Sequence, residues 1–185
     1  ESRDGGNTWD NISANLPNIP ANCVAIENNA ATGVYVGTDL GVFYKDNNLN
    51  SWIPFNNNLP NVIVNEIEIT YNDRRLKIAT YGRGLWKSPL YSDIVPPLAD
   101  ATFPAAVCSG NIVTLTDLSH YHPTSWSWSI SPATFSYVNG TNANSQNPQV
   151  TFNQDGIYNI QLTVSNSLGS HTSYYMSAVS QGGLP

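Results

Sequence analysis

The chain has 185 residues and a formal net charge of −6 at pH 7, from 7 basic and 13 acidic side chains. The basic residues are spread along the chain and form no stripe, which argues against nucleic-acid binding. No apolar run is long enough to span a bilayer. Charged residues are few, and 13 Gly and 12 Pro interrupt the chain, so short strands joined by polar turns are expected. The polar opening, residues 1–6, is not a signal peptide, so the natural protein is expected to begin upstream.

The first half contains an internal repeat, which is a direct guide to architecture. Residues 9–19 recur as residues 52–62, a step of 43 residues, and both segments begin with Trp and contain Leu-Pro-Asn. The same step relates residues 24–26 to residues 67–69, and one residue must be inserted near Arg83 to keep the later strands in register. A unit of this length with about four short strands is typical of a β-propeller blade.

One such unit cannot bury both faces of its sheet, so neighbouring units must stack against it. Two units do not close a ring. The first half, residues 1–95, is therefore expected to be the end of a larger propeller, and the remainder of that propeller is its expected partner.

A short motif near the start, residues 2–9, fits the pattern Ser-x-Asp-x-Gly-x-Thr-Trp. The Asp carboxylate of this pattern can accept backbone N–H groups within a tight hairpin, and the Gly allows a positive φ. The motif resembles the Asp-box of BNR-repeat and sortilin-like propellers, and residues 79–86 resemble closing strands of such propellers in large secreted Bacteroidetes-type surface proteins. A second copy keeps the Asp and the Trp but loses the Gly. The structural Asp-box residues of the two copies are Ser2, Asp4, Gly6, Trp9, Asp46 and Trp52.

The resemblance implies that Asp4 is a folding element and not a catalytic acid. Propellers of this group include sialidases and xyloglucanases, whose catalytic groups lie elsewhere in the ring and match no residue here. The sequence also lacks a Ser elbow or a Cys–His arrangement for nucleophilic catalysis. No catalytic residue is therefore expected in this chain.

A proline pair, Pro96–Pro97, breaks the repeat and favours a stiff, extended connection. It is expected to separate the first domain, residues 1–95, from a second domain, residues 96–185.

The second domain alternates more regularly than the first. Hydroxyl and apolar residues alternate over residues 125–131, and further alternating segments cover residues 150–152 and 158–164. About seven short strands in some 85 residues favour a Greek-key sandwich. The segment expected to close the sheet carries Tyr174, Met176 and Ala178.

Residues 156–166 read Gly-x-Tyr-x-Ile-x-Leu-Thr-Val-x-Asn, and the second domain resembles a PKD domain on the strength of this stretch. The acidic Trp-Asp-Phe-Gly-Asp-Gly turn of that family is absent, and residues 128–132 stand in its place. The resemblance implies a β-sandwich that serves as a spacer, adhesive or contact module in extracellular proteins. The expected fold is thus all-β: terminal blades of a β-propeller plus an immunoglobulin-like (PKD) β-sandwich.

Several polar residues are candidates for a metal site. His120 and His122 could share a metal from one side of a strand, but no further ligand is near in sequence, so a solvated loop is the favoured interpretation. Three isolated aspartates could contribute to calcium binding, although turn capping is favoured for them. No metal site is therefore expected, and calcium is left open. The three aspartates are Asp100, Asp117 and Asp155.

Two tryptophans on one strand, Trp126 and Trp128, could form a platform on which a sugar stacks, and packing in the core is the alternative. Cys23 and Cys108 fall in different expected domains, so a disulfide between them is not expected and two buried thiols are predicted.

These observations favour a non-catalytic structural and interaction segment of a secreted or cell-surface protein. The propeller end would supply a rigid platform, and the PKD module would act as a spacer or binding module. Polysaccharide or other surface or secretion proteins are possible partners. Two alternatives stay open: an accessory region of a secreted glycoside hydrolase or protease whose catalytic residues lie outside this chain, and a polysaccharide-binding adhesin module.

Overall fold

The computed structural model describes residues 1–29, 31–108 and 110–181. The described residues form an all-β fold, as expected, whose only helical segment is the short 3-10 turn η1 (Tyr91–Asp93). They contain no helix that is long and apolar enough to cross a membrane. The chain divides into two compact units, unit 1 (Glu1–Tyr91) and unit 2 (Ser92–Pro185). This division falls after Tyr91, whereas the proline pair led us to place it after residue 95.

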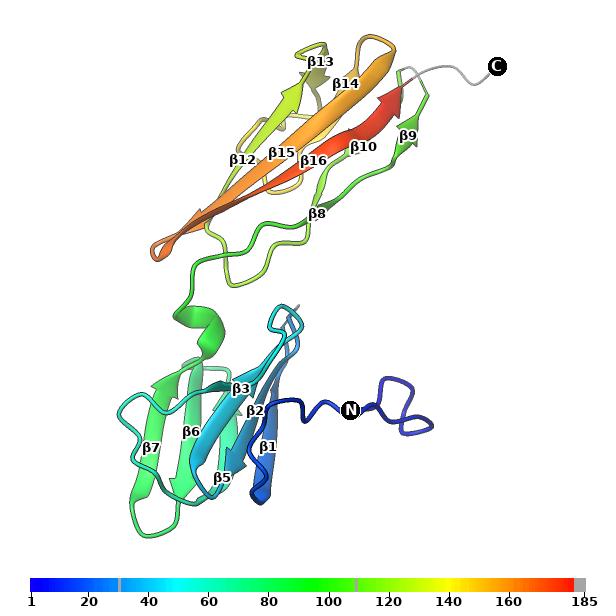
Figure 1. Ribbon diagram of the computed structural model, residues 1–185. Helices are drawn as coiled ribbons and strands as arrows, with labels where there is room; N and C mark the ends of the chain where they lie inside the picture. Colours follow the sequence, from blue (N-terminus) through cyan, green and yellow to red (C-terminus); the bar gives the residue numbers. More distant parts are fainter. Residues whose placement is uncertain (30, 109, 182–185) are drawn as a thin grey trace. The chain divides into compact units, whose positions relative to one another are not determined.

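Unit 1 contains two antiparallel sheets in which the strands follow chain order (Figure 1). Sheet 1 consists of β1 (Ala21–Glu27), β2 (Gly33–Thr38), β3 (Gly41–Lys45) and the short β4 (Ile53–Pro54). Sheet 2 consists of β5 (Val64–Thr70), β6 (Arg75–Thr80) and β7 (Gly84–Pro89).

The sequence repeat corresponds to a structural repeat. The pairing of β1 with β2 has an irregularity after Ala21, and the pairing of β5 with β6 has one 43 residues later, after Val64. The Thr38 hydroxyl donates a hydrogen bond to the Gly41 carbonyl (2.9 Å), and Thr80 bonds the Gly84 carbonyl in the same way (2.7 Å). The second of these turns is one residue longer, so the extra residue near Arg83 lies between β6 and β7.

The two sheets of unit 1 pack against each other around one apolar core. Aromatic side chains fill its centre, and the Tyr44 and Tyr91 rings stack with their centroids 4.2 Å apart. Gly37 has no side chain where sheet 1 approaches sheet 2, because a Cβ there would clash with Cys23 and would lie 2.6 Å from Val64 Cγ1. The buried members of this core are Tyr35, Val42, Tyr44, Leu59, Val62, Val64, Ile67, Leu76, Ile78 and Leu90.

The described residues of unit 2 form nine strands, most of them short. One sheet has the order β12-β15-β16-β9, a second has the order β10-β14-β13, and β11 pairs with β8. The strands are β8 (Ala101–Thr102), β9 (Ala106–Val107), β10 (Val113–Thr114), β11 (Thr116–Asp117), β12 (Ser125–Ser131), β13 (Phe135–Tyr137), β14 (Gln149–Phe152), β15 (Gly156–Asn166) and β16 (Gly169–Gln181).

The core of unit 2 takes every second residue of the long strands, as the alternation predicts. Leu162 and Val164 of β15 are completely buried, and Val113, Val150 and Phe152 come from the other sheet. Two sheets whose apolar sides share one core form a β-sandwich.

The closing strand β16 lies in the expected place and contains all three of the expected residues. Tyr174 and Met176 are 69% and 74% exposed, while Tyr175 packs against the core and Val179 is buried. Tyr175 and not Tyr174 therefore faces the core, since neighbouring residues of a strand lie on opposite faces. The pairing with β15 is irregular after Tyr158, and only Ala178 of the expected set packs against the core.

The two cysteines are both free thiols. The prediction that both are buried is wrong for Cys108, which is exposed, whereas Cys23 is half-buried in unit 1. Burial raises the pKa of the Cys23 thiol above its usual value.

Candidate functional site

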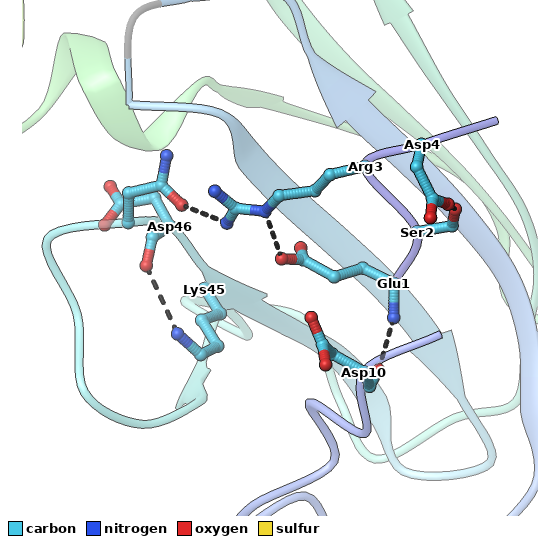
Figure 2. A network of polar contacts seen from close by, with 8 residues as sticks. Glu1, Ser2, Arg3, Asp4, Asp10, Lys45 and Asp46 are labelled. Carbon is cyan, nitrogen blue, oxygen red and sulfur yellow. Dashed lines mark hydrogen bonds and ion pairs between the residues drawn. The ribbon is translucent and has the colours of Figure 1, made fainter. Parts of the chain in front are cut away.

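The Asp-box motif forms a self-contained turn at the start of unit 1. The Asp4 carboxylate accepts the Thr8 backbone N–H at 2.9 Å and the Thr8 hydroxyl at 2.7 Å. The Ser2 hydroxyl donates to the same carboxylate (2.9 Å; Figure 2) and accepts the Gly6 N–H. Gly6 has a φ of 93°, in the region that favours glycine, and its carbonyl accepts the Trp9 indole N–H. Each residue of the motif therefore has a role in holding the turn.

The hydrogen bonds around Asp4 lower the pKa of its carboxyl from 3.8 to about 2, with the Thr8 backbone N–H as the largest cause. A carboxyl whose pKa is lower in the folded state stabilises that state above its unfolded pKa, and this contribution is lost as the pH falls through the folded pKa. The role of Asp4 is structural, since its carboxylate is held by donors within its own turn.

We expect the Asp4 carboxyl to titrate with a midpoint near pH 2 in a carbon-detected NMR titration of the full chain. The Thr8 amide proton should report the same midpoint, because it donates to that carboxylate. Replacement of Thr8 by valine, which removes only the hydroxyl donor, should move the midpoint toward 3.8. A midpoint already near 3.8 in the unmodified chain would contradict the structural role of the turn.

The second copy of the motif is buried and forms a different set of contacts. Asp46 is 3% exposed and accepts the Tyr44 hydroxyl (2.9 Å) and the Asn48 N–H (2.9 Å). Trp52 is 4% exposed, and its indole N–H donates to the Ile12 carbonyl (2.7 Å). Burial, followed by the nearby Asp46 charge, raises the pKa of Tyr44 far above its usual value. This copy thus ties the β3–β4 connection into the core of unit 1.

The N-terminal segment also repeats the β3–β4 hairpin. Tyr44 pairs with Ile53 in sheet 1, and the residues 43 positions earlier are Glu1 and Asp10. The Asp10 N–H donates to the Glu1 carbonyl (2.8 Å), and the Glu1 amino group donates to the Asp10 carbonyl (2.6 Å). Figure 2 shows this pair beside Arg3, whose guanidinium contacts the Glu1 carboxylate at 2.7 Å. Residues 1–10 therefore have the form of the last hairpin of a repeat.

An apolar groove lies beside this hairpin, along the outer face of sheet 1. Val24 and Ile26 of β1 are 60% and 61% exposed, and the Trp9 side chain is exposed nearby. These residues and Ile12 and Val34 form the apolar part of an open groove of about 620 Å³, whose polar part is lined by Glu1, Ser2, Arg3, Thr32 and Asn47. Exposed apolar side chains in a contiguous groove are a mark of an interaction surface.

The outer face of sheet 2 has the opposite character. Glu66 and Glu68 of β5 point away from the core, and Lys77 and Lys87 lie across the sheet from Glu68. These residues surround the exposed Leu85 in a groove of about 340 Å³. The two outer faces of unit 1 therefore differ: one is apolar and one is charged.

The structure places the two candidate sugar-stacking tryptophans with the core of unit 2. Trp128 is 3% exposed and donates its indole N–H to the Ser145 carbonyl (3.0 Å). Trp126 packs against the same core and donates to Asp117 (2.8 Å). Trp128 is therefore a core residue, and Trp126 is partly buried against the same core with its indole N–H already bonded.

The candidate metal ligands do not gather. Within the described residues, no three His, Cys, Asp or Glu side chains are placed to hold one metal ion. Asp117 accepts from Trp126, Gln146 and the Ser119 N–H, and Asp100 accepts from the Ala101 N–H. These aspartates cap turns and join strands, in line with the favoured interpretation from the sequence.

The loop that carries His120 and His122 lies within unit 2. His122 Nε2 is 3.3 Å from the Ser92 hydroxyl and 3.7 Å from an Asp93 oxygen, so it contacts the start of the unit. His120 forms an isolated bridge with Leu98, and His171 accepts the Ala99 N–H at 3.1 Å. The imidazoles of His122 and His171 therefore bond separate segments of unit 2, whereas His120 Nδ1 is buried without a hydrogen-bond partner among the described residues.

The fold of unit 2 defines an immunoglobulin-like β-sandwich. Residues 94–180 match the model of the PKD domain family. Unit 2 is therefore a PKD/immunoglobulin-like domain, and the stretch 156–166 that carried the resemblance forms its long strand β15.

Two solved structures of extracellular proteins are similar at low identity. The full ectodomain of mouse nectin-like molecule 4 is 13% identical with a TM-score of 0.38, and the match covers 90% of this chain and 67% of that one. The extracellular domain of a candidate one component system from B. thetaiotaomicron is 10% identical with a TM-score of 0.29. That match covers 85% of this chain, which spans only 25% of the other. Comparison with curated protein sequences gives no match.

Sequence reasoning missed the apolar groove on sheet 1 and the burial of Asp46. The groove and the burial of Asp46 both depend on which face of a sheet is covered by other segments, and alternation alone does not predict which face that is. One feature of the sequence could have predicted the groove. Val24 and Ile26 lie 43 residues before Ile67 and Ile69, so the same face of each sheet carries apolar side chains in both repeats.

Proposed function

We propose that this chain is a non-catalytic structural and interaction segment of a larger secreted or cell-surface protein. In this proposal unit 1 forms the last two sheets of a β-propeller, and the PKD domain acts as a spacer or contact module beyond it. The extracellular setting is supported by the PKD match of unit 2, and the propeller is supported by the repeat geometry of unit 1.

The observation that carries the propeller proposal is a difference in burial between equivalent positions. Ile67 of sheet 2 is 7% exposed because sheet 1 covers it, and Ile69 packs against the same core. Val24 and Ile26 are their equivalents on sheet 1, and both are about 60% exposed. A preceding sheet of the same design would cover Val24 and Ile26 as sheet 1 covers Ile67 and Ile69.

The charged face of sheet 2 supports its place at the end of the series. Cys23 and Ala25 of sheet 1 pack against the core, and their equivalents 43 residues later are Glu66 and Glu68. A further identical repeat could not bury these carboxylates without a large desolvation cost. In a closed ring the first sheet of the propeller would lie against this face, so that sheet must differ from the repeat and present polar groups to Glu66 and Glu68.

The edge of sheet 2 supports the same ending. In sheet 1 the strand β3 pairs with β4 (Ile53–Pro54), but β7 pairs only with β6. The residues 43 positions after Ile53–Pro54 are Pro96–Pro97, and proline has no N–H to donate to a ladder. Pro54 of β4 shows that one proline is compatible with this edge strand, but residues 96–97 form no strand, so the described sheet 2 has three strands where sheet 1 has four.

The test is an extension of this chain by the residues that precede Glu1 in the natural parent. We expect them to form another unit of about 43 residues whose last hairpin is residues 1–10. In the extended chain the melting temperature of unit 1 should rise, and hydrogen exchange of the β1 amides should slow. An upstream sequence without the repeat, or an extension that leaves both measurements unchanged, would argue against the propeller.

A second candidate function is an accessory role in a secreted glycoside hydrolase or protease. It makes the same prediction for unit 1 and differs only in the parent protein. Activity of the full-length parent, lost on substitution of carboxylates upstream of Glu1, would favour this candidate over the purely structural role.

A further inference from the structure

The outer face of the β12–β15–β16 sheet in unit 2 carries no charged side chain. The three strands have 7, 11 and 13 residues, and none of these is Asp, Glu, Lys or Arg. Trp128 and Leu162 point into the core, so their neighbours along each strand point outward. The outward side chains form rows across the three strands: Ser125–Ser165–Ser170, Ser127–Thr163–Thr172 and Ser129–Gln161–Tyr174.

The rows differ in whether their polar groups already have partners. In the first row the Ser125 and Ser165 hydroxyls lie 2.6 Å apart, and in the second the Thr163 and Thr172 hydroxyls lie 2.8 Å apart. In the third row the side chains form no hydrogen bond with any part of the chain that the structure describes. This row therefore presents a hydroxyl, an amide and a phenol to solvent.

Tyr174 adds an aromatic surface to this row. It is 69% exposed, and it lies across the sheet from Gln161. Its exposure follows from the phase of β16, which turns Tyr175 inward against Phe103 and leaves Tyr174 on the outer face. Hydroxyl and amide groups thus lie on one side of the exposed ring, and the exposed Met176 lies two residues along β16 on the same face.

We propose that the row Ser129–Gln161–Tyr174 is the centre of a binding surface for an uncharged polysaccharide. Sugar rings have an apolar C–H face that packs on an aromatic ring, and their hydroxyls donate and accept like the Gln amide and the Ser hydroxyl. The open face of a sheet accommodates an extended polymer. This proposal rests on the extracellular setting proposed above and is independent of the propeller.

Other occupants fit the surface less well. An anionic polymer would find no opposite charge on these three strands, and charge-assisted contacts dominate the binding of anions. A protein interface is usually centred on a cluster of aromatic and Arg anchors, whereas this face has one aromatic side chain, no Arg, and the exposed Met176 and Ile157 toward one end.

The test is affinity electrophoresis of the full chain in gels containing hydroxyethylcellulose, xyloglucan or xylan, with alginate as the anionic comparison. We expect retardation in at least one neutral gel and none in alginate. Tyr174→Ala should weaken the binding about five- to tenfold, as expected for loss of one stacked ring with its hydroxyl. Tyr81→Ala is the matched control, because Tyr81 is equally exposed (71%) but lies in unit 1.

Charge insertion sharpens the test. Ser129→Glu and Ser129→Lys should both weaken binding to the neutral polymer, since either charge must be partly desolvated there. The proposal is overturned by migration unchanged in every neutral gel, by Tyr174→Ala binding like the unmodified chain, or by Ser129→Lys creating tight retention in alginate. It is equally overturned if sedimentation shows a dimer that Tyr174→Ala dissociates. None of these results affects the propeller proposal, whose test is the stability of the extended chain.

Discussion

Replacement of Ile67 by aspartate is expected to lower the free energy of unfolding of unit 1 by about 4 kcal/mol. Ile67 is 7% exposed between the two sheets, and an aspartate there would be an unpaired charge in an apolar core. Domains of this size are stable by only about 5–15 kcal/mol, so the loss would leave unit 1 marginally folded or unfolded. Urea denaturation followed by the fluorescence of Trp52 and Trp86, both in unit 1, would measure the change.

Val24→Asp is the matched control for this substitution. Val24 has the equivalent position 43 residues earlier on the equivalent strand, so the poor β-propensity of aspartate affects both variants alike. Because Val24 is 60% exposed, its substitution should cost less than about 1 kcal/mol in this chain. In the chain extended upstream, the proposed preceding sheet would cover Val24, and the two substitutions should become similarly destabilising. A large effect of Val24→Asp in the present chain would contradict the exposed face.

Replacement of Leu162 by alanine is expected to destabilise unit 2 by about 2–5 kcal/mol. Leu162 is completely buried in β15, which pairs with β12 on one side and β16 on the other. The central strand of the sheet has the least freedom to collapse around the lost methyl groups, so a cavity should remain and the cost should lie at the upper end of this range. Hydrogen exchange of the β15 amides in the full chain would report the loss.

Leu168→Ala is the control for unit 2. Leu168 lies at the β15–β16 turn and is 48% exposed, so its truncation removes the same atoms with little burial lost. The free energy of unfolding of unit 2 in this variant should change by less than about 1 kcal/mol. Equal effects at the two positions would contradict the core assignment of Leu162.

Local sequence patterns predicted much of the fold. The step of 43 residues gave corresponding strands in unit 1, because a repeated sequence has the same local preferences in each copy. The stretch 156–166 predicted the long strand β15 through its regular alternation. The Asp4 turn was also predictable, since every group it needs lies within eight consecutive residues, 2–9.

The candidate sites were predicted less well, because they depend on which face of each sheet is covered. Alternation placed Trp126 and Trp128 on one face of β12 but did not decide whether that face met a core or a ligand. In the structure Trp128 is a buried member of the core of unit 2, and the partly buried Trp126 packs against that core. Asp46 was predicted as an Asp-box residue, and its burial beside Tyr44 depends on packing between segments distant in sequence.

The sequence by itself determined the PKD/immunoglobulin-like class of unit 2, the repeat of unit 1 and the composition of each strand, because these depend on local preference and spacing. Only the tertiary structure decided the exposure of Val24 and Ile26, the burial of Asp46 and the outward position of Tyr174. The physical reason is that a period of two defines two faces for a strand without saying which one is buried. That choice is made by long-range packing and, in β16, by an irregular pairing with β15 that local patterns do not encode.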